Sequence, residues 1–169
     1  MKLIILGAAQ SGKDTVAEYL SDQYNLNFLA TSIHIAKNVI MPAFPEKYKD
    51  YNECYIDRVN NRKIWAELIN QYCNEDPCRI INEIFEVSDI YCGLRNVDQL
   101  NSYDVKLYDL SIWVERPGYS EDLNSMNIRK EDADIVIYND KDLSDLYAKL
   151  DRLFCLFDNF FFYSENYNI

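Results

Sequence analysis

The chain is short of positive charge and lacks any long apolar run. Its 17 Lys and Arg residues stand against 28 Asp and Glu residues, which gives a formal net charge of −11 at pH 7. So acidic a chain excludes general binding of a nucleic-acid polymer, whose phosphates need neighbouring cations. No run of about 18 apolar residues exists, so we expect no membrane-spanning helix. A small anionic ligand needs only a local group of basic side chains and N–H groups.

The cysteines show no ligand or disulfide pattern. Their number is odd and no C-x-x-C pair occurs, which argues against a disulfide framework and a zinc site. The five are Cys54, Cys73, Cys78, Cys92 and Cys155. Met1 and Lys2 lead directly into an apolar segment, without signal-peptide architecture. We therefore expect reduced thiols and a cytoplasmic location.

The pattern of apolar runs predicts the fold class. The 169 residues, 49% of them hydrophobic, are enough for one domain with its own core. Short apolar runs at 2–6, 27–30, 90–92, 110–114 and 134–138 are typical of buried parallel strands. Helical patterns lie between them; Asp76-Pro77 would begin one, and the last follows helical spacing from Leu143 to Phe157. Strands alternating with helices predict a three-layer α/β fold, with a five-stranded parallel sheet flanked by helices.

The most informative stretch is Gly-Ala-Ala-Gln-Ser-Gly-Lys-Asp-Thr, residues 7–15. It lies between the first strand and a helical pattern, the context of the phosphate-binding P-loop. Gly7 and Gly12 let the backbone turn several N–H groups toward one anion, and the helix adds its positive dipole end. Lys13 can reach the β- and γ-phosphates of a nucleoside triphosphate. The residues predicted to bind the ATP phosphates are Gly7, Ala9, Gln10, Ser11, Gly12, Lys13, Asp14 and Thr15. The alternative is an ordinary glycine-rich turn.

One position departs from the P-loop motif. Ser or Thr should follow the lysine and bind Mg²⁺, but Asp14 follows it here and Thr15 comes one residue later. Phosphates repel a carboxylate unless a cation lies between them. Asp14 is therefore a predicted Mg²⁺ ligand, directly or through water. The alternative is that it only begins the helix favourably.

A second group of residues follows the third predicted strand, which ends at Cys92. A turn at Gly93 would present Arg95 at the start of a helix, with Gln99 one helical turn further on. Arg95 could hold a second phosphate bidentately, and Gln99 could hydrogen-bond the edge of a base. The alternative puts Arg95 in a surface ion pair and Gln99 in solvent.

Arg58 and Arg62 are four residues apart beside an apolar stripe that includes Trp65 and Leu68. On one helix they would share a face and could aim two guanidinium groups at a cleft. The alternative is that they pair with surface acids. The single histidine, His34, is expected to be structural or on the surface.

The chain resembles the nucleoside monophosphate kinases, whose third strand ends in Asp-Gly-Phe-Pro-Arg-x-x-x-Gln. Gly93, Arg95 and Gln99 match, with one residue fewer between Gly and Arg. The loop's Gly-Lys-Asp-Thr is similar to that of phage-type deoxynucleoside monophosphate kinases, although phosphomevalonate kinases also carry Gly-Lys-Asp. The resemblance implies one P-loop kinase domain over residues 1–169. It would have an acceptor-binding helical insert at about 43–76 and a short lid at about 115–130.

Two features depart from that family. Cys92 stands where the family has the Asp that helps to organise Mg²⁺. The family's lid usually supplies several arginines, whereas the lid region here holds two, Arg116 and Arg129, plus Lys130. We predict the two arginines to close over the transferred group; the alternative is two ordinary surface arginines. Asn139 and Asp140 follow the fifth predicted strand, where the family implies a place near the adenine. Both are also ordinary helix-starting residues.

Together these features predict ATP- and Mg²⁺-dependent phosphoryl transfer to a (deoxy)nucleoside monophosphate, giving the diphosphate. The acceptor would be bound by Arg58, Arg62, Arg95 and Gln99, and the catalytic residues would be Lys13, Arg95, Arg116 and Arg129. The alternatives are a P-loop kinase of another small phosphorylated metabolite and a nucleotide-binding module without transfer activity. The aromatic run at residues 160–163 would either pack on the domain or form a homodimer contact.

Overall fold

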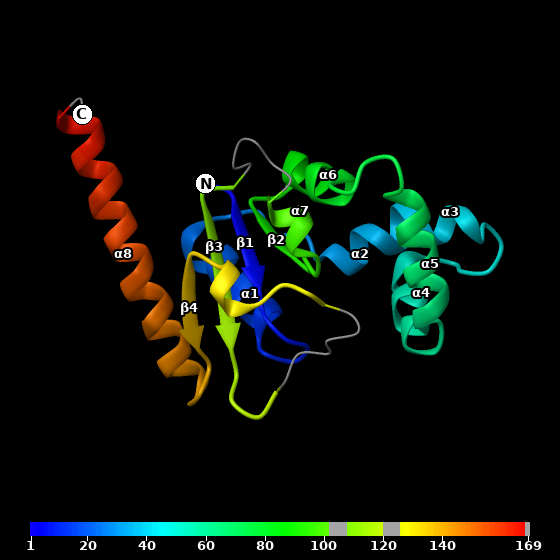
Figure 1. The fold of residues 1–169 in the computed structure, drawn as a ribbon, viewed down its shortest axis with the longest axis horizontal. Coiled ribbons are helices and arrows are strands. Elements are labelled where there is room, and N and C mark those ends of the chain that lie inside the picture. Colours follow the sequence, from blue (N-terminus) through cyan, green and yellow to red (C-terminus); the bar gives the residue numbers. More distant parts are fainter. Residues whose placement is uncertain (102–107, 120–125, 168–169) are drawn as a thin grey trace.

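The structure is a computed structural model that describes residues 1–101, 108–119 and 126–167, without the side chains of Asn101 and of residues 157–167. At its centre lies a parallel sheet (Figure 1). Its strands, among the described residues, are β1 (Leu3–Leu6), β2 (Ile90–Cys92), β3 (Leu110–Glu115) and β4 (Ile135–Tyr138), in the order β2-β1-β3-β4. Leu3 pairs with Ile90 on one side and with Leu110 on the other. β1 is therefore central, and its carboxyl end opens into the Gly7–Thr15 loop.

Helices cover both faces of this sheet. The first part of the chain forms α1 (Lys13–Tyr24), α2 (Thr31–Ile35), the π-helix η1 (Ala36–Ile40), α3 (Met41–Ala43), α4 (Tyr51–Asp57) and the 3₁₀ turn η2 (Arg58–Asn60). The rest forms α5 (Arg62–Tyr72), α6 (Arg79–Val87), α7 (Val97–Asn101), the 3₁₀ turn η3 (Lys130–Asp132) and α8 (Leu143–Tyr167). No helix in the described ranges combines the length and apolarity needed to cross a membrane.

The alternation of side chains along the strands builds two cores. Ile4 and Leu6 point to the face covered by α2, η1, α5 and α6. Leu3 and Ile5 point to the opposite face, where α1 and α8 supply buried residues such as Leu20. The predicted three-layer α/β class with a parallel sheet is therefore confirmed.

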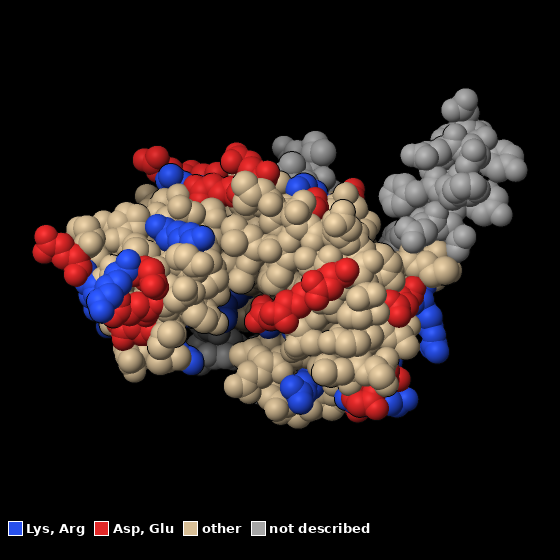
Figure 2. All heavy atoms as spheres, turned by 180° about the vertical axis from the view of Figure 1, so that it is seen from behind, with Lys and Arg blue, Asp and Glu red and all other residues tan. Residues whose placement is uncertain are grey.

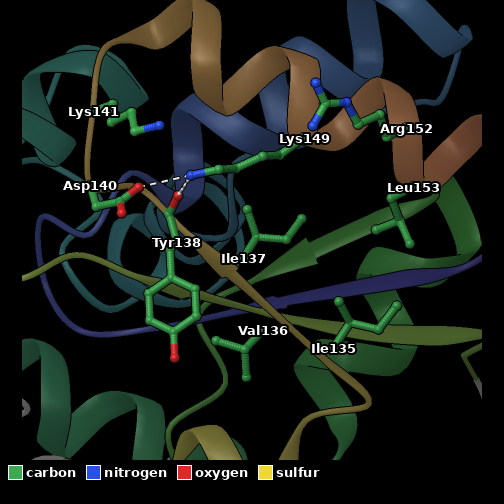
Figure 3. A pocket seen from close by; sticks show the side chains of 9 residues that line it. All are labelled: Ile135, Val136, Ile137, Tyr138, Asp140, Lys141, Lys149, Arg152 and Leu153. Atoms are coloured by element: carbon green, nitrogen blue, oxygen red, sulfur yellow. Dashed lines mark hydrogen bonds and ion pairs between the residues drawn. The ribbon is translucent and has the colours of Figure 1, made fainter.

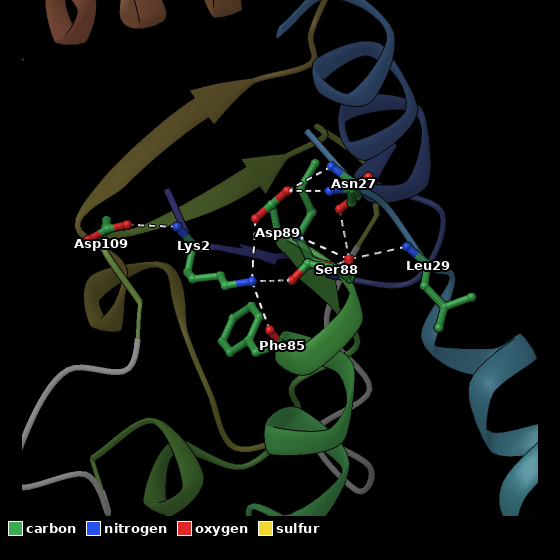
Figure 4. Close-up of polar contacts among 8 residues, drawn as sticks. Lys2, Asn27, Leu29, Phe85, Ser88, Asp89 and Asp109 are labelled. Atoms are coloured by element: carbon green, nitrogen blue, oxygen red, sulfur yellow. Dashed lines mark hydrogen bonds and ion pairs between the residues drawn. The ribbon is translucent and has the colours of Figure 1, made fainter. Parts of the chain in front are cut away.

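The sheet has one strand fewer than predicted, because residues 27–30 do not form a strand. Phe28 makes only an isolated parallel bridge with Ile90 at the β2 edge. The N–H of Leu29 donates to Ser88 Oγ (3.2 Å) instead of a strand carbonyl, and α2 begins two residues later (Figure 4). The main chain pairs at Asn27 O, which accepts from Asp89 N (2.7 Å), and the serine hydroxyl takes the place of the next strand acceptor. This corrects the strand predicted at 27–30, although the segment lies beside β2 at the sheet edge.

Ser88 is the centre of this edge. It is 1% exposed, and its hydroxyl also donates to Asn27 O (2.8 Å). We expect Ser88→Ala to lower the free energy of unfolding by about 1–3 kcal/mol, because the part-buried N–H of Leu29 loses its acceptor. Urea denaturation would measure this loss. Ser144→Ala is the control, since Ser144 is exposed and bonds only Asp142 (2.8 Å). Equal losses in the two variants would contradict the central role of Ser88.

A proline explains the π-helix. The helical run from Thr31 to Ala43 includes Pro42, which has no N–H and whose ring would meet the carbonyl four residues earlier. The N–H of Met41 bonds Ala36 O, five residues back, which is the wider turn that makes room for it. The run leads away from the sheet toward α4 and α5 (Figure 1). Residues 43–76, the predicted acceptor-binding insert, are largely helical, and their acceptor role stays a prediction.

Candidate phosphoryl-transfer site

Backbone conformation fixes the loop between β1 and α1. Gly7 and Gly12 have φ of +142° and +102°, values that side chains rarely adopt. A Cβ at Gly7 would lie 2.5 Å from Val114 O, and one at Gly12 would lie 2.6 Å from Asn139 Nδ2. Both positions therefore require glycine. Gln10 also has a positive φ, of 62°, so three of the six residues from Gly7 to Gly12 have a positive φ.

Two side chains from distant strands hold this loop from outside. Asn139, which follows β4, donates to Ser11 O (2.9 Å), and Arg116, which follows β3, donates to Gln10 O (3.2 Å). The first hydrogen bond of α1 runs from Val16 N to Gly12 O (3.0 Å). The preceding N–H groups thus have no partner within the helix, as at any helix start. This arrangement favours an anion at the loop.

Ser11 gives a further sign of an oxyanion site. Its hydroxyl is fully buried and has no hydrogen-bond partner within the described part of the chain. A Cβ at Gly7 would lie only 2.7 Å from this oxygen, so the hydroxyl sits inside the loop. A phosphate oxygen bound there would satisfy it, because buried polar groups are costly when unpaired. The residues therefore fit a nucleotide phosphate.

Lys13 and Arg95 lie close enough to affect each other. Lys13 is half-buried, and its ammonium donates to Ala8 O (2.5 Å). Burial lowers the pKa of Lys13, the Asp14 carboxylate opposes that shift, and the charge of Arg95 adds to it. Two cations from the ends of neighbouring strands thus repel each other. An anion bound between them would remove this repulsion.

The acidic surface contrasts with this local positive charge. Acidic side chains spread over the outside of the molecule, and basic atoms are seen in a hollow near the middle of the face in Figure 2. Basic side chains also lie on the outer surface in this view, among acidic ones, in a chain whose formal net charge is −11. The basic atoms in the hollow agree with the expectation of a small anionic ligand.

The end of β2 supplies no carboxylate. Cys92 is buried, and its thiol faces Lys13 O (3.9 Å). Burial raises the pKa of the Cys92 thiol, and the Asp14 carboxylate adds to the rise, so the thiol stays neutral. In the described ranges no group of three or more His, Cys, Asp or Glu could hold a metal ion. The loop itself offers two hard oxygen donors, Asp14 and Thr15, which suit Mg²⁺ if phosphate and water complete its shell.

The turn with Arg95 and the first turn of α7 have separate contacts. Gly93 has φ of +129°, Leu94 is buried, and Arg95 is exposed. The Gln99 amide donates to Pro77 O, ahead of α6. The solvated alternative for Gln99 is therefore not seen. Its base-reading role stays a prediction.

Arg58 and Arg62 do not share one helix. η2 ends at Asn60 and α5 begins at Arg62, so the helical path is interrupted at Asn61. Asn60 and Asn61 cause the interruption, because both side chains bond back to Asp57 (3.2 and 3.0 Å). The common helical face predicted from their spacing is therefore corrected. Arg58 lies over the ring of Trp65 (5.7 Å to the centroid), and Arg62 is exposed.

The predicted lid is described only at its two ends, because residues 120–125 lie outside the described ranges. Arg116 lies over the Tyr119 ring (4.7 Å to the centroid) and bonds the loop at Gln10. Arg129 is exposed, and its N–H donates to Asp132 Oδ2 (2.7 Å) at the start of η3. The structure thus brings Arg116 to the loop and shows no such contact for Arg129.

Asn139 and Asp140 point to different places. Asn139 holds the loop, whereas Asp140 faces a hollow between β4 and α8 (Figure 3). There Lys149 bonds both Asp140 Oδ1 (2.8 Å) and Tyr138 O (2.6 Å), and it holds the pKa of Asp140 below its usual value. His34 is buried and bonds Glu83 (2.8 Å), the structural role expected for it.

Comparison with known proteins gives a distant likeness in fold. No family model matches the chain, and no curated protein matches it. The chain is similar to a solved structure of shikimate kinase from Aquifex aeolicus vf5. The TM-score is 0.49 and the identity 19%, over 94% of this chain and 98% of that one. At this level of likeness, the neighbour's substrate says nothing about the substrate of this chain.

Proposed function

We propose that the protein transfers the γ-phosphoryl group of ATP to a (deoxy)nucleoside monophosphate. The observation that carries the proposal is that Lys13 follows β1 and Arg95 follows β2, two strands that pair in parallel, so both turns leave the same edge of the sheet. The Lys13 side suits the donor phosphates, because Lys13 stands at the start of α1, where the first N–H groups have no partner within the helix. The Arg95 side suits a second phosphate. Two phosphate sites at one edge of a parallel sheet are what transfer between nucleotides requires.

The proposed reaction needs positioning rather than covalent chemistry. An oxygen of the acceptor phosphate attacks the γ-phosphorus, the bond to the β–γ bridging oxygen breaks, and ADP leaves. No general base is needed, because the acceptor oxygen is already ionised. Lys13, the loop N–H groups and Ser11 would hold the donor phosphates. Mg²⁺, near Asp14 and Thr15, would neutralise charge on the β- and γ-oxygens.

The remaining predicted residues complete the proposal. Arg95 would hold the acceptor phosphate, with help from Arg58 or Arg62, and Gln99 would read its base. Arg116 and Arg129 would stabilise the transferred group. Asn139 and Asp140 would lie on the adenine side. The contact of Asn139 with the loop backbone supports a place near the donor nucleotide.

An acceptor panel tests this function. The protein would be mixed with ATP, Mg²⁺ and each ribo- and deoxynucleoside monophosphate, and the products separated by ion-exchange chromatography. We expect diphosphate formation with at least one base. A panel without product, alongside measurable ATP binding, would contradict the kinase proposal. That result would favour the binding module, which the thiol at Cys92 in place of a carboxylate also supports. A second panel, of small non-nucleotide phosphates, would separate the other alternative: product with these alone would favour a metabolite kinase.

Asp14 has a separate test. Asp14→Asn should raise the Mg²⁺ concentration for half-maximal activity by about threefold or more, because a carboxylate binds the cation better than an amide. Mg²⁺ titration at saturating ATP would measure it. Asp22→Asn removes the same charge from an exposed site further along α1 and should leave the Mg²⁺ dependence unchanged. Equal dependence in both variants would reduce Asp14 to a helix-starting residue.

A further inference from the structure

One residue of the segment before η3 binds three consecutive residues of the Arg95 turn. The N–H of Asn127 donates to Arg95 O (3.0 Å), and its side-chain oxygen accepts from Val97 N (2.8 Å). Its side-chain nitrogen donates to Asn96 Oδ1 (3.2 Å). The turn at Arg95 is thus tied to a segment about 30 residues away in sequence.

Asn127 is itself firmly placed. Its neighbours Met126 and Ile128 are buried, at 8% and 0% exposure, in the same core as Trp113 and Leu94. Only Asn127 between them is exposed. The burial of these two neighbours places the backbone of Asn127, and its own hydrogen bonds place its side chain. Asn127 is therefore a fixed support for whatever it binds.

The Arg95 turn needs such a support. It lies between the end of β2 and α7, a helix of five residues, which is too short to be stable alone. Asn96 Oδ1 accepts from Asp98 N (2.9 Å) and so begins α7. The same oxygen accepts from Asn127. Asn127 thus holds both the backbone of Arg95 and the residue that caps the next helix.

We infer that Asn127 is a positioning residue, which fixes the turn that carries Arg95 and so sets the affinity for the acceptor phosphate. The inference rests on the proposed function, because it takes the acceptor to bind at Arg95. Asn127 touches no reacting atom in this scheme. Its effect should appear in acceptor binding and leave ATP binding almost unchanged.

Steady-state kinetics of two variants test the inference. Asn127→Ala loses both side-chain hydrogen bonds and should raise the KM for the acceptor about tenfold. Asn127→Asp keeps an oxygen for Val97 N but loses the donor to Asn96, and should raise that KM about threefold. The KM for ATP should change less than about twofold in both. Asn27→Ala is the matched control, since its amide bonds Asp89 (3.1 Å) at the amino end of β2. It should leave the KM of both substrates unchanged.

Hydrogen exchange gives a readout that needs no activity. Asn127→Ala should exchange faster than wild type in residues 93–101, with residues 7–15 unchanged. Unchanged exchange in 93–101 would overturn the inference. So would faster exchange there with an unaltered acceptor KM, or equal rises in the KM of both substrates. If the wild-type protein phosphorylates no acceptor, the proposed function is wrong, and so is the role of Asn127 in acceptor binding. The exchange result would still show whether Asn127 holds the turn.

Discussion

Lys13→Ala should lower turnover by about a thousandfold while the protein stays folded. Lys13 is half-buried at the start of α1 and is the only side-chain cation within residues 7–15. In the proposed reaction it faces charge that spreads over the transferred group, where a fixed cation is worth several kcal/mol. Single-turnover rates with ATP and the preferred acceptor would measure the loss. Melting temperature would confirm that the variant folds.

The control for this variant is Lys49→Ala, which removes the same charge from an exposed site ahead of α4. It should retain wild-type turnover. If a folded Lys13→Ala protein also kept near wild-type turnover, the loop would not be the donor site. The pH profile adds a second check. As the pH rises, kcat/KM for ATP should fall when Lys13 loses its proton. Because burial lowers the pKa of Lys13, this fall should come at a lower pH than for an ordinary lysine.

The loop could be predicted from sequence because its constraints are local. Gly7, Gly12 and Lys13 lie within seven residues, and both glycines have a positive φ, which the turn from strand to helix requires. The α/β class was predictable for the same reason, since buried parallel strands and amphipathic helices leave different periods in the sequence. These features depend on neighbours in the chain.

The rest depended on contacts between distant segments. Residues 27–30 read as a strand, but the side chain of Ser88 replaced a strand partner. The spacing of Arg58 and Arg62 predicted a shared face, yet the asparagines between them bonded back to Asp57. A polar side chain that bonds to the backbone competes with helix or strand hydrogen bonds, and the spacing of apolar residues does not reveal this competition.

Two functional contacts left no signal in the sequence. Asn139 reaches Ser11 O across 128 positions, and Asn127 reaches the Arg95 turn across about 30. Asn139 was singled out for a different reason, as a residue near the adenine, and Asn127 was not singled out at all. An asparagine beside a strand or a turn is too common for its type alone to mark a role. Only the folded chain shows which backbone groups it holds.

Arg95→Ala should weaken acceptor binding about thirtyfold and leave ATP binding nearly intact. A bidentate guanidinium–phosphate contact is charge-assisted and worth about 2 kcal/mol, which corresponds to that factor. Arg95→Lys should lose most of the same affinity, because an ammonium cannot reproduce the planar fork. Loss of Arg95 also removes a repulsive charge from Lys13, so the pKa of Lys13 should rise. ATP affinity should then hold or improve slightly.

Calorimetric titration of each variant with ATP and with the monophosphate, separately, would decide between the two subsites. Arg152→Ala is the control for acceptor binding, because it removes an exposed guanidinium from α8, on the other face of the sheet from Trp113. Its acceptor affinity should equal that of wild type. If Arg95→Ala lost ATP binding and kept monophosphate binding, Arg95 would belong to the donor side. Lys13 and Arg95 would then hold one nucleotide together, and the second phosphate site would have to be sought beyond the carboxyl end of β2.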